Sequence, residues 1–134
     1  MNHDDTLSGL LLFAHGARDP QWARPFEAVA AQCRARAPGR PVQLAFLEFM
    51  SPGLVAAGAQ LAAAGCRRVD VLPLFLGAGG HVRKDIPALM AQLMAEHPQV
   101  QWTLHPAVGE AAAVIDAMAQ VALAAAQLPE VAVR

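Results

Sequence analysis

The feature of this sequence that most constrains its fold is an alternation of short apolar runs with longer segments whose apolar residues recur at helical spacing. The runs of strand length lie at about residues 10–14, 42–47, 69–76 and 101–104, and a helix-like segment follows each of them. This alternation is typical of successive βα units around a parallel sheet. We therefore predict an α/β fold with three layers, αβα, and a four-stranded parallel sheet in the order 2-1-3-4.

The composition fits one domain and argues against two classes of partner. The 134 residues suit a single domain with its core at about residues 9–126 and mobile tails at residues 1–8 and 129–134. Ten basic residues against eleven acidic ones give a net charge of -1, so no basic surface is available for nucleic acid or an anionic membrane. The most apolar run, residues 71–80, is about half as long as a membrane-spanning helix. We therefore expect the protein to bind neither nucleic acid nor a membrane.

The start of the chain and its cysteines predict a cytoplasmic location. The segment MNHDDTLSG carries two acidic residues where a secretory signal carries basic ones. Cys33 and Cys66 are too few and too far apart for a disulfide framework or a thiolate zinc site. We predict that both are small core residues of a cytoplasmic protein.

Helix starts and buried faces follow from the same pattern. Asp19 before Pro20, and Ser51 before Pro52, have the form of an N-cap followed by a first-turn proline. Asp85 is a further candidate cap. The residues predicted to face the core are Trp22, Phe26, Val29 and Cys33 in the first helix, Leu54, Gly58 and Leu61 in the second, Ile86, Leu89, Met90, Leu93 and Met94 in the third, and Val114, Met118, Val121 and Ala125 in the last.

Side chains capable of chemistry follow every predicted strand. His15 comes after the first strand, Glu48 after the second, His81 after the third and His105 after the fourth. The carboxyl ends of parallel strands meet at one edge of the sheet, where ligands bind in such folds. With the predicted strand order, His15 and His81 lie on neighbouring loops with Glu48 beside them. Two imidazoles and a carboxylate suit divalent cobalt, nickel, iron or zinc and leave coordination positions open.

A spacing that occurs twice in the sequence supports the two histidines, His15 and His81, as a pair. His15 precedes Asp19 by four residues, and His81 precedes Asp85 by four. Two similar helix starts explain the aspartates but not the histidines. The role of His105 stays open, because it is either a site residue or part of an ordinary His-Pro turn. The remaining histidines, predicted to lie at the surface, are His3 and His97.

The loop between the third strand and its helix is rich in glycine. Gly77, Gly79 and Gly80 lack the spacings of the dinucleotide and phosphate-binding loops, so we predict no nucleotide. Gly79 and Gly80 instead let a wide, flat ligand approach the backbone. Cationic side chains at the same mouth either bind ligand carboxylates or are simply solvated. They are Arg18, Arg83 and Lys84.

Three segments carry a resemblance to a known family. They are LLFAHGARDPQWARPFEAVA, VQLAFLEFMSPGL and VDVLPLFLGAGGHVRKDIPAL, and the last contains the specific pattern G-x-G-G-H-V-x-x-D. Over roughly residues 9–126 the sequence resembles the small, single-domain sirohydrochlorin chelatases of the CbiX type. This resemblance implies the ATP-independent insertion of a divalent metal into the tetrapyrrole sirohydrochlorin, carried out by a homodimer.

The resemblance also implies roles for individual residues. His15 and His81 match the family's metal-binding histidines, one of which would also accept a proton, and Glu48 matches a further ligand that some relatives use. Phe75 and Leu76 either face the macrocycle or belong to the core. The residues that would bind the substrate are Arg18, Gly79, Gly80, Arg83 and Lys84.

Alternatives remain both for the metal and for the function. Cobalt, iron and nickel all accept this set of donors, and the resemblance favours cobalt for cobalamin over iron for siroheme. A metal carrier or sensor would use the same site without catalysis, and a flavodoxin-like structural domain would not use it at all. A histidine phosphotransferase is disfavoured, because Ala14 stands where such enzymes carry an arginine.

Overall fold

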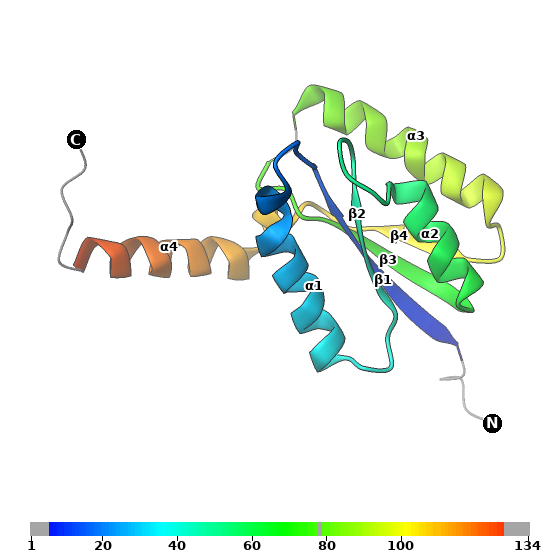
Figure 1. Cartoon of the computed structure of the whole chain (residues 1–134), viewed down its shortest axis with the longest axis horizontal. Coiled ribbons are helices and arrows are strands. Elements are labelled where there is room, and N and C mark those ends of the chain that lie inside the picture. Colours follow the sequence, from blue (N-terminus) through cyan, green and yellow to red (C-terminus); the bar gives the residue numbers. More distant parts are fainter. Residues whose placement is uncertain (1–5, 78, 128–134) are drawn as a thin grey trace.

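A parallel sheet of four strands in the order β2-β1-β3-β4 organises the chain. The computed structural model describes residues 6–77 and 79–127, with the backbone alone at residues 81–83. The strands are β1 (Leu7–Ala14), β2 (Val42–Phe46), β3 (Cys66–Pro73) and β4 (Gln101–Leu104). Helix α1 (Arg24–Arg36) lies on one face of the sheet, and α2 (Leu54–Ala63) and α3 (Gly80–Glu96) lie on the other (Figure 1). The predicted α/β class, the αβα layers and the strand order are confirmed.

β1 is the central element of the fold, since it pairs with both β2 and β3. Its successive side chains alternate between two cores. Leu11 and Phe13 pack with residues of α2 and α3, while Leu12 and Ala14 pack in the cluster beneath α1. All four side chains are at most 1% exposed. Burial on both faces explains the continuous apolar run that predicted this strand.

Two strands begin earlier than predicted. β1 starts at Leu7 rather than Leu10, and therefore takes in two residues of the expected N-terminal tail. β3 starts at Cys66 and ends at Pro73, which leaves residues 74–76 in the following loop. Pro73 has no N–H group with which to continue a ladder of hydrogen bonds. The rest of the expected tails, residues 1–5 and 128–134, lies outside the described residues.

The predicted N-cap at Asp19 is confirmed. Its carboxylate accepts a hydrogen bond from the Gln21 N–H at 3.0 Å. The helix that it caps is a short 3-10 helix, η2 (Pro20–Ala23), which leads directly into α1. The Arg34 guanidinium then donates two hydrogen bonds to the Val42 carbonyl oxygen, at 2.9 and 3.2 Å, and thereby fastens α1 to β2.

The other two predicted caps are wrong. The N-cap of α2 is Gly53 rather than Ser51. The Phe46 N–H donates to the Pro52 carbonyl at 2.9 Å, so Pro52 is bonded to the end of β2 and α2 starts only at Leu54. The N-cap of α3 is Gly79, so Asp85 lies inside the helix instead of at its start.

Most of the predicted faces of α1, α2 and α3 point inward. The buried residues of the predicted faces are Leu54, Gly58 and Leu61 in α2 and Ile86, Met90 and Leu93 in α3, while Trp22, Phe26, Cys33 and Leu89 are half-buried. Val29 and Met94 are exceptions, since 41% and 49% of their surfaces are exposed. Both lie at the edge of their helix's buried stripe. On α1 the fully buried residue is instead Ala30.

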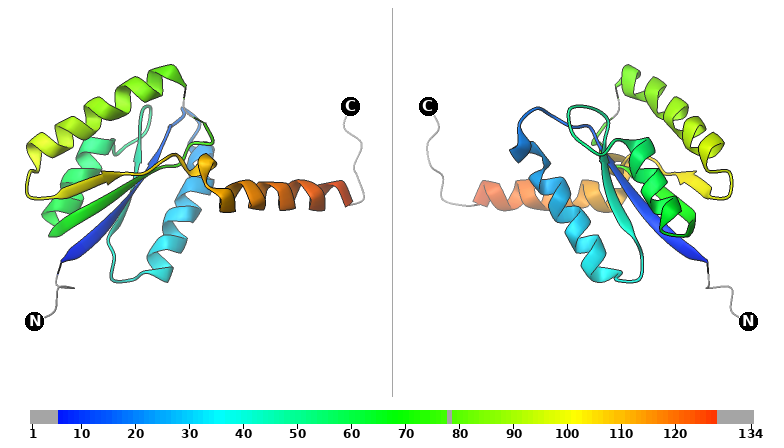
Figure 2. Two further views of the ribbon diagram at one scale, coloured as in Figure 1. Left: turned by 180° about the vertical axis from the view of Figure 1, so that it is seen from behind. Right: turned by 45° about the vertical axis from the view of Figure 1, so that its right-hand side comes forward.

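The last helix, α4 (Ala112–Gln127), does not cover the sheet at all. It projects away from the rest of the molecule in every view (Figure 1 and Figure 2), and none of its residues is buried. The predicted inward face of Val114, Met118, Val121 and Ala125 is therefore wrong for a single copy of the chain. Although α4 is apolar, no described helix is both long and apolar enough to span a bilayer. The cytoplasmic location stays a prediction.

The two cysteines differ in burial, and one histidine is more buried than predicted. Cys66 is a core residue, as predicted, and burial raises the pKa of its thiol. Cys33 is only half-buried. His97, predicted at the surface, is half-buried at the end of α3, where its ring centroid lies 6.1 Å from that of Trp102. His3 lies outside the described residues.

We expect Gly58→Ala to destabilise the fold. A Cβ at Gly58 would overlap the Leu93 side chain and come within 3.1 Å of the Trp102 ring. Alanine improves helix propensity by about 1 kcal/mol, whereas overpacking a core costs about 1–3 kcal/mol, so the clash outweighs the gain. The measurement is the urea midpoint of unfolding. Gly39→Ala is the control, because a Cβ there meets nothing within 4 Å. A higher midpoint for Gly58→Ala than for the control would contradict this packing.

Candidate metal site at the carboxyl edge

Backbone hydrogen bonds hold the loops after β1 and β2 together. The Leu47 N–H donates to the Ala14 carbonyl at 2.9 Å, and the Glu48 N–H donates to the His15 carbonyl at 3.1 Å. Hydrogen bonding between the two segments thus continues one residue past the end of β1 and two residues past the end of β2. Gly16 turns the first loop with a φ of +95°, and a Cβ at this position would overlap the Glu48 carbonyl oxygen. The backbone itself therefore sets the positions of His15 and Glu48.

The side chains of His15 and Glu48 meet at this edge. The His15 Nε2 lies 3.8 Å from the Glu48 Oε2, and the two side chains are 41% and 42% exposed. The ring of Phe75, from the loop after β3, packs edge-on against the imidazole with the centroids 5.6 Å apart and an interplanar angle of 62°. Phe75 is itself buried. The imidazole is therefore supported by the core on one side and accessible to solvent on the other.

The distance between these two side chains suits a shared cation. Imidazole nitrogen and carboxylate oxygen each bind zinc-like ions at about 2.0–2.2 Å. At bond angles between octahedral and tetrahedral values, such ligand atoms lie roughly 3.0–3.5 Å apart. The observed 3.8 Å between His15 and Glu48 differs from this range by only a few tenths of an ångström. A small side-chain rotation brings both atoms to one ion.

His81, the third predicted ligand, is the second residue of α3. The first turn of α3 lies at the same edge of the sheet as the loops that follow β1 and β2 (Figure 1). The side chain of His81 lies outside the described residues, so its meeting with His15 stays a prediction. Among the side chains that the structure describes, no three His, Cys, Asp or Glu residues gather into a metal-binding group.

The mouth of the site combines cationic and apolar side chains. The Arg18 guanidinium lies 4.8 Å from the centroid of the Phe49 ring, in a cation–π arrangement. Phe49 and Leu76 are both exposed. Of the two residues that the sequence left open, Phe75 thus belongs to the core and Leu76 faces solvent. Phe49 was missed, although its place directly after Glu48 was a usable signal.

The remaining predicted substrate residues belong to the start of α3. Gly79 is its N-cap and Gly80 its first residue, and a Cβ at either would meet nothing within 4 Å. Among the described residues, none fills the space beside these glycines. Lys84 is exposed, and the side chain of Arg83 lies outside the described residues.

His105 does not join His15 and Glu48. Its Nε2 lies 2.8 Å from the Asp70 Oδ1, on the face of the sheet that α1 partly covers. The Arg40 guanidinium lies 4.0 Å from the other Asp70 oxygen. Sequence reasoning missed Asp70, although a single acid inside an apolar strand was a signal that its side chain faces an open surface.

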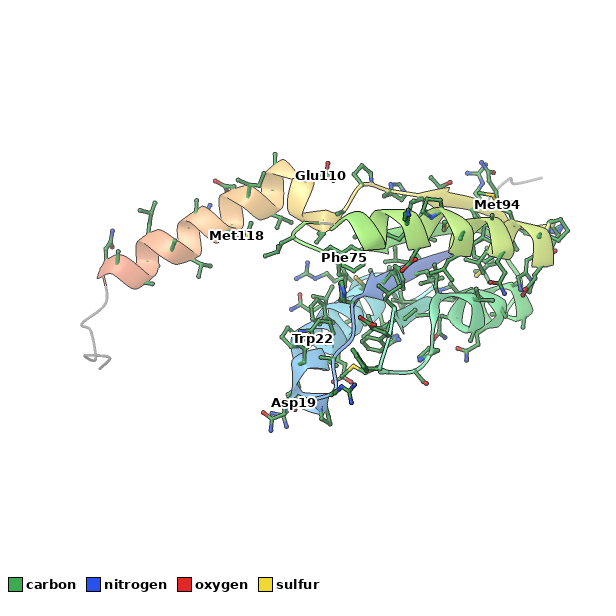
Figure 3. All side chains as sticks on the ribbon, turned by 90° about the horizontal axis from the view of Figure 1, so that it is seen from above. Asp19, Trp22, Phe75, Met94, Glu110 and Met118 are labelled. Carbon is green, nitrogen blue, oxygen red and sulfur yellow. The ribbon has the colours of Figure 1, made fainter. Side chains whose placement is uncertain are left out.

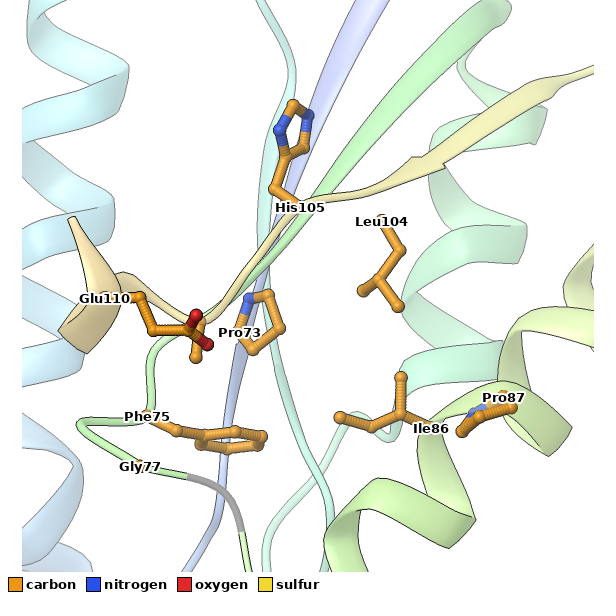
Figure 4. Close-up of a pocket in the computed structure, with 9 residues that line it drawn as sticks. Pro73, Phe75, Gly77, Ile86, Pro87, Leu104, His105 and Glu110 are labelled. Carbon is orange, nitrogen blue, oxygen red and sulfur yellow. The ribbon is translucent and has the colours of Figure 1, made fainter.

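A mostly apolar cavity of about 410 Å³ lies beside Phe75, between the loop after β3, the start of α3 and the end of β4 (Figure 4). Its polar groups come from Glu110 and from His105, whose ring points away from Phe75. The size is within the range of about 300–1,000 Å³ that is usual for small-molecule sites. Phe75 thus contacts both this cavity and the His15 imidazole.

The sequence between residues 9 and 125 matches the family model of CbiX. The chain belongs to the CbiX family. A protein from Methanothermobacter thermautotrophicus named sirohydrochlorin cobaltochelatase is 34% identical over 82 residues, which are 61% of this chain and 57% of the relative. One of the same name from Saccharolobus islandicus is 35% identical over 84 residues, 63% of this chain and 64% of the relative. The chain thus matches about three fifths of the length of these relatives.

Solved structures agree with the CbiX assignment. The crystal structure of a CbiX protein from Marinobacter aquaeolei is 30% identical, with a TM-score of 0.78 over 90% of this chain and 98% of that one. SirB from Bacillus subtilis with Fe³⁺ is 21% identical, with a TM-score of 0.78 over 92% of this chain and 49% of that one. At this lower identity the likeness concerns the fold alone.

Gly16→Ala tests whether the backbone sets the position of Glu48. The variant combines a left-handed φ, strained for alanine by about 1–2 kcal/mol, with the overlap on the Glu48 carbonyl. Gly65→Ala is the matched control, because Gly65 has a φ of +98° but open space around its Cβ. We expect Gly16→Ala to lower the free energy of unfolding by more than the control does, as measured with urea. Equal losses in the two variants would show that the overlap is relieved without cost.

Proposed function

We propose that this CbiX protein inserts a divalent metal into sirohydrochlorin without ATP. The observation that carries the proposal is the His15–Glu48 pair, which lies at the carboxyl edge of the sheet with 3.8 Å between its ligand atoms. The names of the curated relatives support sirohydrochlorin as the substrate and cobalt as the favoured metal. Fe²⁺ and Ni²⁺ are the alternatives, since the same donors accept them. With cobalt the product serves cobalamin synthesis, and with iron it serves siroheme synthesis.

In this proposal the metal substrate binds to His15, Glu48 and His81. Three ligands leave coordination positions at which the ion meets the nitrogens of the tetrapyrrole. Imidazole and carboxylate hold such an ion less firmly than a cage of thiolates does. The exposure of His15 and Glu48 supports ready exchange. The buried position of Cys66 keeps its thiol away from the ion.

Metal insertion also needs a proton acceptor. As M²⁺ enters the macrocycle, two pyrrole N–H groups lose their protons, so the products are the metallated tetrapyrrole and two H⁺. We assign His15 or His81 as the acceptor of one proton as the ion leaves it, because imidazole exchanges protons near neutral pH. The edge-on contact of Phe75 supports an orienting role for this residue, since it limits rotation of the His15 ring.

The substrate would lie across the mouth of the site. Sirohydrochlorin carries peripheral carboxylates, which suit the cationic side chains at the mouth. The exposed rings and alkyl groups of Phe49 and Leu76 offer apolar contact to the macrocycle. The residues assigned to substrate binding are Arg18, Gly79, Gly80, Arg83 and Lys84.

We also propose that the active form is a homodimer. The match to SirB covers 92% of this chain but only 49% of the longer SirB chain. Two copies of this chain would supply an amount of structure comparable to that longer chain. A closed pair related by a two-fold axis is the commonest assembly of soluble proteins.

The proposal is tested by mixing the protein with Co²⁺ and sirohydrochlorin and following the absorbance change of metallation. We expect His15→Ala to lower kcat/KM by at least about 100-fold, the lower end of the range for a residue in general acid–base roles. Glu48→Gln, which keeps the shape but removes the charge, is expected to weaken Co²⁺ binding. His105→Ala is the matched control, because this histidine also follows a strand but lies 2.8 Å from Asp70 instead of at the candidate site.

Two outcomes would decide against a chelatase. Co²⁺ binding that depends on His15 without any acceleration over the spontaneous reaction would indicate a metal carrier or sensor. The absence of Co²⁺ binding by calorimetry would indicate a structural domain. A competition among Co²⁺, Ni²⁺ and Fe²⁺ in the same assay then identifies the preferred metal.

A further inference from the structure

We propose that Phe49 is a specificity-determining residue, whose ring contacts the flat face of the macrocycle and holds the Arg18 guanidinium toward a peripheral carboxylate of the same ligand. This inference rests on the proposed function, since it specifies how the tetrapyrrole is recognised. It accounts for an exposed aromatic side chain in a backbone conformation that aromatic residues rarely adopt.

The backbone of Phe49 lies in the left-handed region, with a φ of +68°. Among the described residues, it is the one non-glycine residue with a positive φ. A side chain with a Cβ is disfavoured in this region, and a bulky one especially so. Glycine or asparagine would form the same turn with less strain. Strained residues of this kind concentrate at sites where a protein binds its ligands.

The loop that carries Phe49 is fixed on both sides. Leu47, two residues before it, packs against the core shared with α2 and α3. Met50, directly after it, packs against the core beneath α1. The Phe46 N–H donates to the Pro52 carbonyl at 2.9 Å and closes the loop. The neighbours of Phe49 therefore constrain its backbone, while its own side chain stays outside both cores.

The fold by itself gains little from an aromatic residue at this position. Phe49 is 58% exposed, so its ring contributes less hydrophobic stabilisation than a buried ring does. The Arg18 guanidinium lies over this ring, 4.8 Å from its centroid, and more than half of Phe49 is exposed even with that contact in place. A residue that combines a strained backbone with an exposed apolar side chain is expected at a functional site.

The contact with Phe49 prepares Arg18 to bind an anion. A guanidinium over an aromatic face is attracted to the ring without using its N–H donors. Within the part of the chain that the structure describes, the Arg18 guanidinium forms no ion pair with a carboxylate. Its donors are thus available to a carboxylate of the ligand. The ring and the guanidinium together match a flat macrocycle that carries carboxylates at its periphery.

The strand order places a second exposed apolar residue on the other side of His15. β1 lies between β2 and β3, so the loop with His15 lies between the loops with Phe49 and Leu76. Neighbouring strands are about 4.8 Å apart, so the two outer loops start about 10 Å apart. Leu76 is 68% exposed, and its loop is fixed because the Gly109 N–H donates to the Phe75 carbonyl at 2.9 Å. A ligand that touches both side chains must be wide, which fits a tetrapyrrole.

The test measures the Kd for metal-free sirohydrochlorin from the change in its absorbance, without Co²⁺ and without turnover. We expect Phe49→Leu and Phe49→Asn each to raise this Kd by at least about 5-fold, the lower end of the effect of losing one aromatic stacking contact. In the metallation assay both variants should raise KM more than they lower kcat. Co²⁺ binding by calorimetry should not change.

Met94→Ala is the matched control for these substitutions. Met94 is also an exposed apolar residue, at 49%, but it lies toward the far end of α3 from Phe75 (Figure 3). Its substitution should leave the Kd for sirohydrochlorin unchanged. A Kd that rises equally in Met94→Ala would show that the loss is not specific to Phe49.

A double-substitution cycle tests whether Arg18 and the Phe49 ring act as one unit. We expect Arg18→Gln to raise the Kd by at least about 10-fold, as for a lost hydrogen bond to a charged group. Arg36→Gln is its control, because Arg36 is an exposed arginine at the last residue of α1. The effect of Arg18→Gln combined with Phe49→Leu should fall short of the product of the single effects by at least about 2-fold. A full product would refute the unit.

Stability separates recognition of the ligand from a structural role. Since asparagine tolerates a left-handed backbone, we expect Phe49→Asn to unfold at the wild-type urea midpoint or above it. Met50→Asn, one residue further on, should unfold at a lower midpoint, because Met50 packs against the core. A clear drop in the midpoint of Phe49→Asn would assign the ring to the fold and overturn the inference.

The remaining outcomes distinguish this inference from the proposed function. If the wild-type protein accelerates metallation and the Phe49 variants bind sirohydrochlorin equally well, the inference is refuted and the function stands. If binding depends on Phe49 but metallation is not accelerated, the chelatase function fails and recognition of the tetrapyrrole stands. If the variants lose affinity only as far as they lower the oligomeric mass in sedimentation velocity, Phe49 is a subunit contact and the inference is refuted.

Discussion

The parallel pairing of β1 with β2 and β3 is the constraint on which the rest of the structure depends. β1 is buried on both faces, so its register fixes both cores at once. The same pairing runs on past the strands, through the hydrogen bond from the Glu48 N–H to the His15 carbonyl. A change in the register of β1 against β2 would therefore separate the two candidate ligands as well as disturb the core.

The candidate site combines a rigid backbone with accessible side chains. Gly16 permits a close approach that no residue with a Cβ allows, and Phe75 joins the His15 ring to the buried core. The two side chains are nevertheless about two fifths exposed, at 41% for His15 and 42% for Glu48. An ion that must be received and then released needs this combination, because a fully enclosed site would hold it and a mobile one would not align it with the macrocycle.

Helix α4 shows that an apolar pattern does not identify the surface that covers it. A doubly wound sheet has helices over both faces, and among the described residues α1 is the single α-helix that packs on its side of the sheet. The apolar residues of α4 have the spacing of a buried helix but lie in solvent in a single copy. Their exposure leaves α4 as an apolar surface that no described element covers, and contiguous exposed apolar area of this extent is unusual on a single copy of a protein.

The sequence by itself determined the class of fold, the strand order and the neighbouring positions of His15 and Glu48. Continuous apolar runs of strand length specify buried parallel strands, and residues that follow such strands must share one edge, so His15 and Glu48 were predicted to be neighbours. Only the tertiary structure decided which contacts those residues make. The structure places Asp70 beside His105, and it makes Gly53 rather than Ser51 the N-cap of α2. It also directs α4 away from the sheet. The periodicity of apolar residues indicates that a helix face is suited to burial. It does not identify the surface that covers this face, because that surface can belong to the same chain or to another copy.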